Sequence, residues 1–154
     1  MDIEFSLALP RDAIGIPMVR RVLGDAMRSL HVSESCIADM LLAVSEACSN
    51  AVRHGGPANR YEVTASIGSG RCDVRVVDNG VGIPSMPLTF PPPDTENGRG
   101  LLIMRSVVDE ISFGITPGRG RSRCRGAESA GASRAGRPRC RRRVRRSGRS
   151  RSRP

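Results

Sequence analysis

The segment SEACSNAVRH, residues 45–54, is the part of the sequence that says most about the fold. It ends a stretch in which apolar residues recur every three or four positions after Ser33, and this period predicts an amphipathic helix with Ser33 as its N-cap. Glu46, Asn50 and His54 follow one another at intervals of four residues, so they lie near one helical face. A carboxylate and a carboxamide at the edge of a core can polarise a hydroxyl and hold a hard cation through oxygen. An ordinary solvated helix face is the alternative.

The elements around this helix follow from hydrophobic periods of two or of three to four residues. Strands are expected at residues 3–9, 61–67, 72–76 and 111–115, and further helices at residues 17–30 and 101–108. Gly68-Ser69-Gly70 joins the middle two strands as a hairpin. The order β-α-α-β-β-loop-α-β predicts an α+β fold, a two-layer sandwich with its helices on one face of a mixed sheet.

Two glycine-rich segments stand where strands and helices should meet. The first, DNGVG at residues 78–82, follows a strand, and an acidic side chain there can accept hydrogen bonds from a ligand amine. The second, GRG at residues 98–100, follows a proline-rich loop and opens a helix, whose free N–H groups can cradle a phosphate. Taken singly, the first is also an ordinary turn and the second a flexible hinge.

Together the three motifs carry a resemblance. SEACSNAVRH, DNGVGIP and GRGLLIM, in this order and about 28 and 20 residues apart, resemble the N box and the two glycine boxes of the Bergerat-type ATP-binding fold of histidine kinases and gyrase. Residues 3–117 are most similar to anti-sigma factor serine/threonine kinases of the RsbW and SpoIIAB type. The resemblance implies a cytoplasmic regulator that binds ATP with magnesium, sequesters a sigma factor, phosphorylates a serine or threonine of an antagonist protein and works as a homodimer.

The same resemblance implies roles for single residues. Asn50 would ligate the magnesium ion, Glu46 would act as the base on the target hydroxyl, and Asp78 would accept a hydrogen bond from the adenine amino group. The residues expected to shape the base pocket and to close on the triphosphate are, respectively, Gly80 and Gly82, and Gly98, Arg99 and Gly100. Phosphoryl transfer depends mainly on positioning and on charge stabilisation.

Other polar residues near these motifs have weaker assignments. His54 stands at a position that is often basic in the N box, and we expect a structural role for it. Arg20 and Arg21 flank the apolar stripe of the helix at residues 17–30, and the resemblance suggests contact with the sigma factor or the antagonist. An exposed charged face is the alternative for these two arginines. An ATP-binding module that sequesters its partner without kinase activity is the alternative function.

The charge of the 154-residue chain is divided unevenly. All 25 basic residues are arginine, and the net charge of +10 combines −4 in residues 1–117 with +14 in residues 118–154. The second segment contains no Leu, Ile, Met or aromatic residue, so it cannot bury enough apolar surface to offset the entropy of ordering. We therefore expect one ATP-binding domain at residues 1–117, with its last strand missing, and a disordered arginine-rich tail at residues 118–154.

Two origins of the tail stay open. A shifted reading frame in a GC-rich gene would yield this Arg, Gly, Ala, Pro and Ser composition. A real basic tail would instead contact nucleic acid through phosphate charge, nonspecifically because it lacks aromatic residues for stacking, and this is a second alternative function.

Cellular location is predicted from what the sequence lacks. No apolar run approaches the roughly 18 to 20 residues of a membrane span, and the first ten residues lack the basic start of a signal peptide. The five cysteines show no metal-ligand spacing, and an odd number does not suit a disulfide framework. We expect reduced thiols, no membrane contact and a cytoplasmic location.

Overall fold

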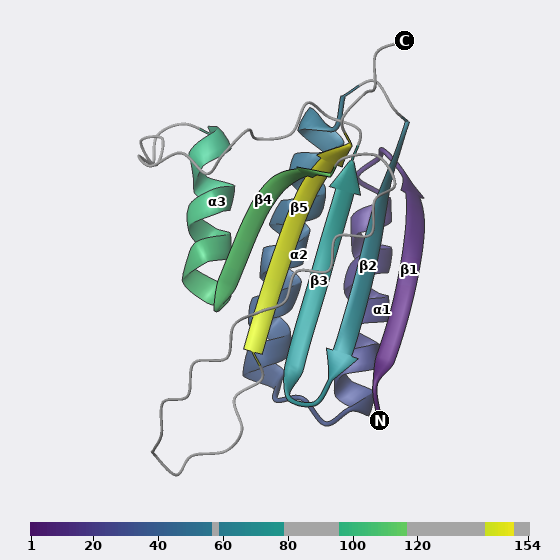
Figure 1. The fold of residues 1–154 in the computed structure, drawn as a ribbon, viewed down its shortest axis with the longest axis vertical. Helices are drawn as coiled ribbons and strands as arrows, with labels where there is room; N and C mark the ends of the chain where they lie inside the picture. Colours follow the sequence, from purple (N-terminus) through teal and green to yellow (C-terminus); the bar gives the residue numbers. More distant parts are fainter. Residues whose placement is uncertain (57–58, 79–95, 117–140, 150–154) are drawn as a thin grey trace.

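The computed structural model describes residues 1–56, 59–78, 96–116 and 141–149. The elements in these residues are β1 (Ile3–Pro10), α1 (Gly15–Ser29), α2 (Glu34–His54), β2 (Arg60–Gly68), β3 (Arg71–Asp78), α3 (Glu96–Val107), β4 (Glu110–Thr116) and β5 (Arg141–Arg149). The strands form one layer and the helices the other (Figure 1). The predicted α+β two-layer sandwich is confirmed.

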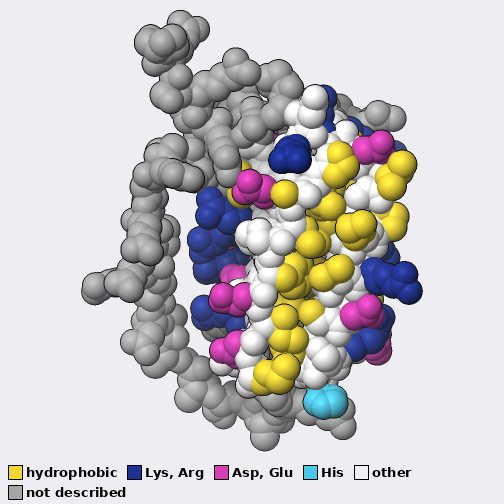
Figure 2. Space-filling view, turned by 90° about the vertical axis from the view of Figure 1, so that its right-hand side faces the viewer, with side chains coloured by type: hydrophobic (Ala, Val, Ile, Leu, Met, Phe, Trp, Pro, Cys, Tyr) yellow, Lys and Arg dark blue, Asp and Glu magenta, His cyan; other side chains and the backbone are white. Residues whose placement is uncertain are grey.

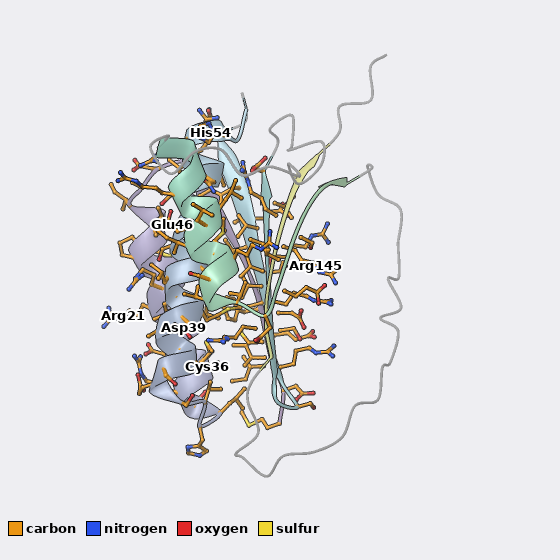
Figure 3. All side chains as sticks on the ribbon, turned by 90° about the vertical axis from the view of Figure 1, so that its left-hand side faces the viewer. Arg21, Cys36, Asp39, Glu46, His54 and Arg145 are labelled. Carbon is orange, nitrogen blue, oxygen red and sulfur yellow. The ribbon has the colours of Figure 1, made fainter. Side chains whose placement is uncertain are left out.

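The sheet has the strand order β1-β2-β3-β5-β4. β1, β2 and β3 are antiparallel neighbours, whereas β5 lies between β3 and β4 and runs parallel to both. The hairpin joining β2 to β3 turns at Ser69 and Gly70, both with positive φ, as the glycine-rich signal indicated. All helices pack against one face of this mixed sheet, and the other face is uncovered by described elements (Figures 1 and 3).

The core lies between the sheet and α2. The Ser33 hydroxyl caps α2 by accepting a hydrogen bond from the backbone N–H of Cys36 at 3.4 Å, as predicted. The buried side of α2 is largely small or flexible, and its members are Cys36, Ile37, Met40, Ala43, Val44, Ala47, Cys48 and Ala51. By length and composition alone α2 could cross a membrane, a property that a buried core helix shares.

The expectation that the last strand is missing is wrong. Residues 141–149, which composition placed in a disordered tail, form β5 in the interior of the sheet. The rest of that tail, residues 118–140 and 150–154, lies outside the described residues. The domain therefore includes a segment more than twenty residues beyond its expected end at residue 117.

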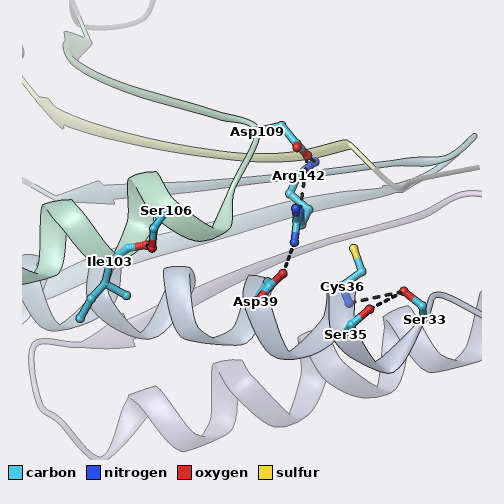
Figure 4. A network of polar contacts seen from close by, with 8 residues as sticks. All are labelled: Ser33, Ser35, Cys36, Asp39, Ile103, Ser106, Asp109 and Arg142. Atoms are coloured by element: carbon cyan, nitrogen blue, oxygen red, sulfur yellow. Dashed lines mark hydrogen bonds and ion pairs between the residues drawn. The ribbon is translucent and has the colours of Figure 1, made fainter.

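Arginine can occupy the helix-facing side of β5 because acidic residues meet it there. Arg142 pairs with Asp39 of α2, and its backbone N–H donates to the Asp109 carboxylate at 2.8 Å (Figure 4). Burial would lower the pKa of Arg142, but the hydrogen bond and charge of Asp109 and the charge of Asp39 raise it. Val144 is buried in the core, and Arg146 is buried beyond it. The acidic body thus neutralises side chains that composition alone would assign to solvent.

Candidate functional site

The first and third motifs meet between α2 and α3. Glu46 and Asn50 are both half-buried on α2, and Gly100 is buried in the first turns of α3. A Cβ atom placed on Gly100 would lie 2.8 Å from Glu46 Oε2 and 3.8 Å from Asn50 Nδ2. The absence of a side chain at residue 100 is therefore what allows α3 to approach the carboxylate and the carboxamide so closely.

The glycine segment at the start of α3 lies inside the helix. α3 begins at Glu96, five residues before the expected start, so residues 98–100 lie in its first turns and not ahead of it. Arg99 is exposed there. Backbone N–H groups in the first turn of a helix lack intrahelical acceptors, and this turn of α3 immediately precedes Gly100, the residue that lies close to Glu46 and Asn50.

The second motif reaches the same region from the sheet. Asp78 ends β3 and is only 2% exposed. It lies beside Gly55, the residue after α2, because a Cβ on Gly55 would stand 3.3 Å from the Asp78 Cβ and 2.2 Å from the Ala51 carbonyl oxygen. The glycine at position 55 thus lets the end of α2 approach the end of β3. Gly80 and Gly82 lie outside the described residues.

A residue that the sequence did not single out joins the two halves of this cluster. Arg146 of β5 donates from Nε to Asp78 Oδ2 at 2.9 Å, and its Nη2 lies 2.7 Å from the same oxygen. Nη2 also donates to the backbone carbonyl of Asn50 at 3.3 Å. The pairing of Arg146 with a buried carboxylate could be predicted only after the arginine-rich segment had been recognised as a strand, because a buried arginine needs a charged partner.

The two arginines of α1, Arg20 and Arg21, differ in their surroundings. Arg20 donates to the Leu41 carbonyl at 3.3 Å and to the Ser45 hydroxyl at 2.7 Å, so it ties α1 to α2 one residue before Glu46. Arg21 is exposed and points away from the core (Figure 3). His54 is exposed at the last residue of α2.

The cysteines in the described part of the chain are buried. Cys36, Cys48 and Cys72 form no disulfide, and only Cys48 lies next to the cluster. Burial raises the pKa of Cys48, which lies between Glu46 and Asn50 in sequence but on the core side, to about 12. A thiol with that pKa is protonated at neutral pH and is a poor nucleophile. The chemistry available at the cluster is therefore that of carboxylate, carboxamide and backbone donors.

Metal binding by protein groups alone is not indicated in the described part of the chain. No group of three or more His, Cys, Asp or Glu residues that could hold a metal ion occurs there. Magnesium needs only one or two protein oxygens when substrate phosphates and water complete its octahedron, and the Asn50 carboxamide is an oxygen donor of this kind.

A separate hollow of about 610 Å³ lies on the uncovered face of the sheet. Polar residues such as Thr64, Arg75 and Arg145 line it, and Arg145 points away from the helices (Figure 3). The sheet separates this hollow from Glu46 and Asn50, so it is not part of the cluster.

Comparison with known proteins agrees with the motifs. Residues 9–121 match the family described as histidine kinase-like ATPase domain. The chain is 27% identical over 125 residues to the serine-protein kinase RsbW of Bacillus cereus, covering 71% of this chain and 76% of that protein. It is 26% identical over 125 residues to the serine-protein kinase RsbW of Bacillus thuringiensis, with the same coverage. On its three motifs, its fold and this match, the chain belongs to the histidine kinase-like ATPase domain family, and within it resembles the RsbW serine-protein kinases.

Proposed function

We propose that this protein is an anti-sigma factor kinase: it binds ATP with magnesium, sequesters a sigma factor and phosphorylates a serine or threonine of an antagonist protein. The observation that carries the proposal is the meeting of Glu46, Asn50 and Gly100 between α2 and α3. The similarity to the serine-protein kinase RsbW supports the choice of acceptor residue.

The residues fit the phosphate end of the nucleotide. A carboxylate and a carboxamide, both half-buried, face a helix start at which a glycine leaves no side chain in the way. Oxygen donors suit magnesium, and the N–H groups of a helix start suit phosphate. The end of the site proposed to bind adenine is not free in the same way, because the Asp78 carboxylate forms an ion pair with Arg146 in the structure.

Each residue has a distinct task in the proposed reaction. ATP and magnesium would supply the transferable phosphoryl group and neutralise its charge. Asn50 would hold the metal through its carboxamide oxygen. Glu46 would take the proton from the target hydroxyl as that oxygen bonds to the γ-phosphorus of ATP, while the bond from this phosphorus to the β-phosphate oxygen breaks and ADP leaves. Gly98, Arg99 and Gly100 would lie along the phosphates. Asp78 would orient the base, with Gly80 and Gly82 around it.

A surface feature supports a protein partner. Ile14 and Met18, at the start of α1, are 80% and 55% exposed. Separately, apolar side chains form a stripe on the face seen in Figure 2. Exposed apolar residues that gather on one face are typical of protein interaction sites. We assign this face to contact with a protein partner, and we propose that the protein acts in the cytoplasm as a homodimer.

The decisive experiment combines binding with phosphoryl transfer. The purified chain is titrated with Mg-ATP by calorimetry and then incubated with labelled ATP and a candidate antagonist. We expect Glu46→Gln to lower transfer by about 10²–10⁴-fold, the range of general base catalysis, while ATP affinity stays within about twofold. Glu34→Gln is the matched control, because Glu34 is an exposed carboxylate on the same helix, paired with Arg28.

The outcomes separate the proposal from its alternatives. ATP binding without transfer in the native chain would identify a sequestering module that lacks kinase activity. Normal transfer by Glu46→Gln would remove the assigned base. Absence of any ATP binding would overturn the proposed function itself.

A further inference from the structure

We propose that Arg146 is an internal competitor for the nucleotide: its guanidinium occupies the Asp78 carboxylate, so adenine recognition requires Arg146 to let go. This inference rests on the proposed function, because it assumes that Asp78 is the group that recognises adenine. Under this proposal the last strand of the sheet, β5, inhibits ATP binding.

The contact is strong enough to compete. Nε and Nη2 of Arg146 both approach Asp78 Oδ2, at 2.9 and 2.7 Å, and the side chains are 9% and 1% exposed. Hydrogen bonds between two ionised groups are roughly twice as strong as neutral ones. The amino group of adenine is a neutral donor, so at this carboxylate the guanidinium is the stronger partner.

The sheet register delivers Arg146 to this place. In the parallel ladder between β3 and β5, Val76 is opposite Arg146 and Asp78 is opposite Gly148. Arg146 therefore stands two positions from Asp78, and both side chains are buried. A shift of β5 by one residue would turn Arg146 to the uncovered face.

The opposite end of β5 fixes that register. Arg142, four residues earlier, is held by Asp39 of α2 and by Asp109, the residue before β4 (Figure 4). With Arg142 held there, the period of two places Val144 in the core and Arg146 at Asp78. Holding Asp78 is thus a consequence of how the whole strand is seated.

Arg146 lies outside the residues that match the family domain. The match to the histidine kinase-like ATPase domain covers residues 9–121, and β5 begins at Arg141. The three motifs lie inside the matched residues, whereas the group that engages Asp78 lies outside them. The competitor therefore belongs to a segment that can differ without change in the motifs.

Competition predicts both affinity and base selectivity. If only a fraction of molecules has Asp78 released, the apparent dissociation constant for ATP rises by the inverse of that fraction. Inosine triphosphate lacks the amino group that Asp78 would accept from, so its affinity gains little when Asp78 is released. The ratio of ATP to inosine triphosphate affinity therefore reports the state of Asp78.

The test is calorimetric titration of the full chain with Mg-ATP and with Mg-inosine triphosphate. We expect Arg146→Gln to bind ATP about tenfold more tightly and to raise the preference for ATP by a similar factor. Arg145→Gln is the matched control: it removes the same charge from the neighbouring position, which faces away from the helices (Figure 3), and should bind both nucleotides as the native chain does.

A second variant guards against misfolding. Arg146→Lys keeps the positive charge opposite Asp78 but cannot offer two donors to one oxygen, so a smaller gain in ATP preference, about threefold, is expected. Circular dichroism establishes which variants are folded, and Arg146→Lys decides the case if Arg146→Gln is not.

The possible failures are distinguishable. If the native chain binds ATP and the folded Arg146 variants bind it equally or more weakly, Arg146 does not compete with the nucleotide, and the proposed function is unaffected. No heat with either nucleotide in the native chain or in any folded variant overturns both proposals. Binding that appears only in the Arg146 variants supports both.

Discussion

The end of α2 and strand β5 carry the two halves of the candidate site, and they differ in how their positions are determined. Glu46 and Asn50 are placed by the period of one helix, with an N-cap and a glycine after its end. Arg142 and Arg146 are placed by acidic partners that are 33 or more residues away in sequence. The first arrangement is local, whereas the second exists only in the folded sheet.

The difference shows that composition is a poor guide to order when charges are matched. A segment with one valine among arginines has too little apolar surface to fold alone. It can still form a central strand if the body provides carboxylates at the right positions, and Asp39, Asp78 and Asp109 do so. Because desolvation of two buried charges offsets most of their attraction, we expect these ion pairs to contribute to the register of β5 more than to the free energy of unfolding.

The largest expected effect tests how dry the core side of α2 is. Burial raises the pKa of Cys48 to about 12, from an ordinary value of 9.0. Because the folded state disfavours the thiolate, stability is complete below pH 9 and is lost as pH rises from 9 to 12, by about 4 kcal/mol from this thiol alone. Urea unfolding at pH 8, 9.5 and 11 measures the slope.

Cys48→Ala is the matched control for that slope. It removes the thiol, so the free energy of unfolding should fall less steeply with pH than in the native chain. Burial also raises the pKa of Tyr61, and the charge and hydrogen bond of Cys48 raise it further, so the variant should keep only the part of the loss above pH 10 that burial causes. Equal slopes in the two proteins would mean that water reaches Cys48.

How much was predictable follows the same division. The helix periods and the hairpin predicted the two-layer fold, because each of these signals lies within about twenty residues of sequence. The meeting of Glu46 with Gly100, which are far apart in the chain, was implied only by the family resemblance of the three motifs. The place of Arg146 was not predictable, since it depends on a parallel pairing with β3 across more than sixty residues. The sequence of β5 also lacks the alternating hydrophobic pattern of a strand, because arginine and valine share its helix-facing side.

The second prediction, of intermediate size, concerns whether β5 contributes as much as β3 to the free energy of unfolding. Val144 and Val74 are directly opposite in the ladder, and each is 1% exposed. Val144→Ala and Val74→Ala should therefore lower the free energy of unfolding by similar amounts, about 2 kcal/mol. Chemical denaturation of both variants makes the comparison. A loss for Val74→Ala with none for Val144→Ala would remove β5 from the cooperative core.

The smallest effect separates stability from function at the helix contact itself. A Cβ on Gly100 would stand 2.8 Å from Glu46 Oε2, the far end of a flexible side chain, so Gly100→Ala displaces the carboxylate while the fold is kept. Alanine also favours a helix interior over glycine, so the melting temperature should hold or rise slightly. Phosphoryl transfer should fall about tenfold, because the base is moved from its place. Gly24→Ala in α1 is the control: its Cβ would meet the Arg28 guanidinium at 3.3 Å and Leu41 Cδ1 at 3.6 Å, neither of which belongs to the candidate site, and transfer should not change. A drop in melting temperature for Gly100→Ala alone would show that α3 is held rigidly against α2, and that the glycine serves packing and not the carboxylate.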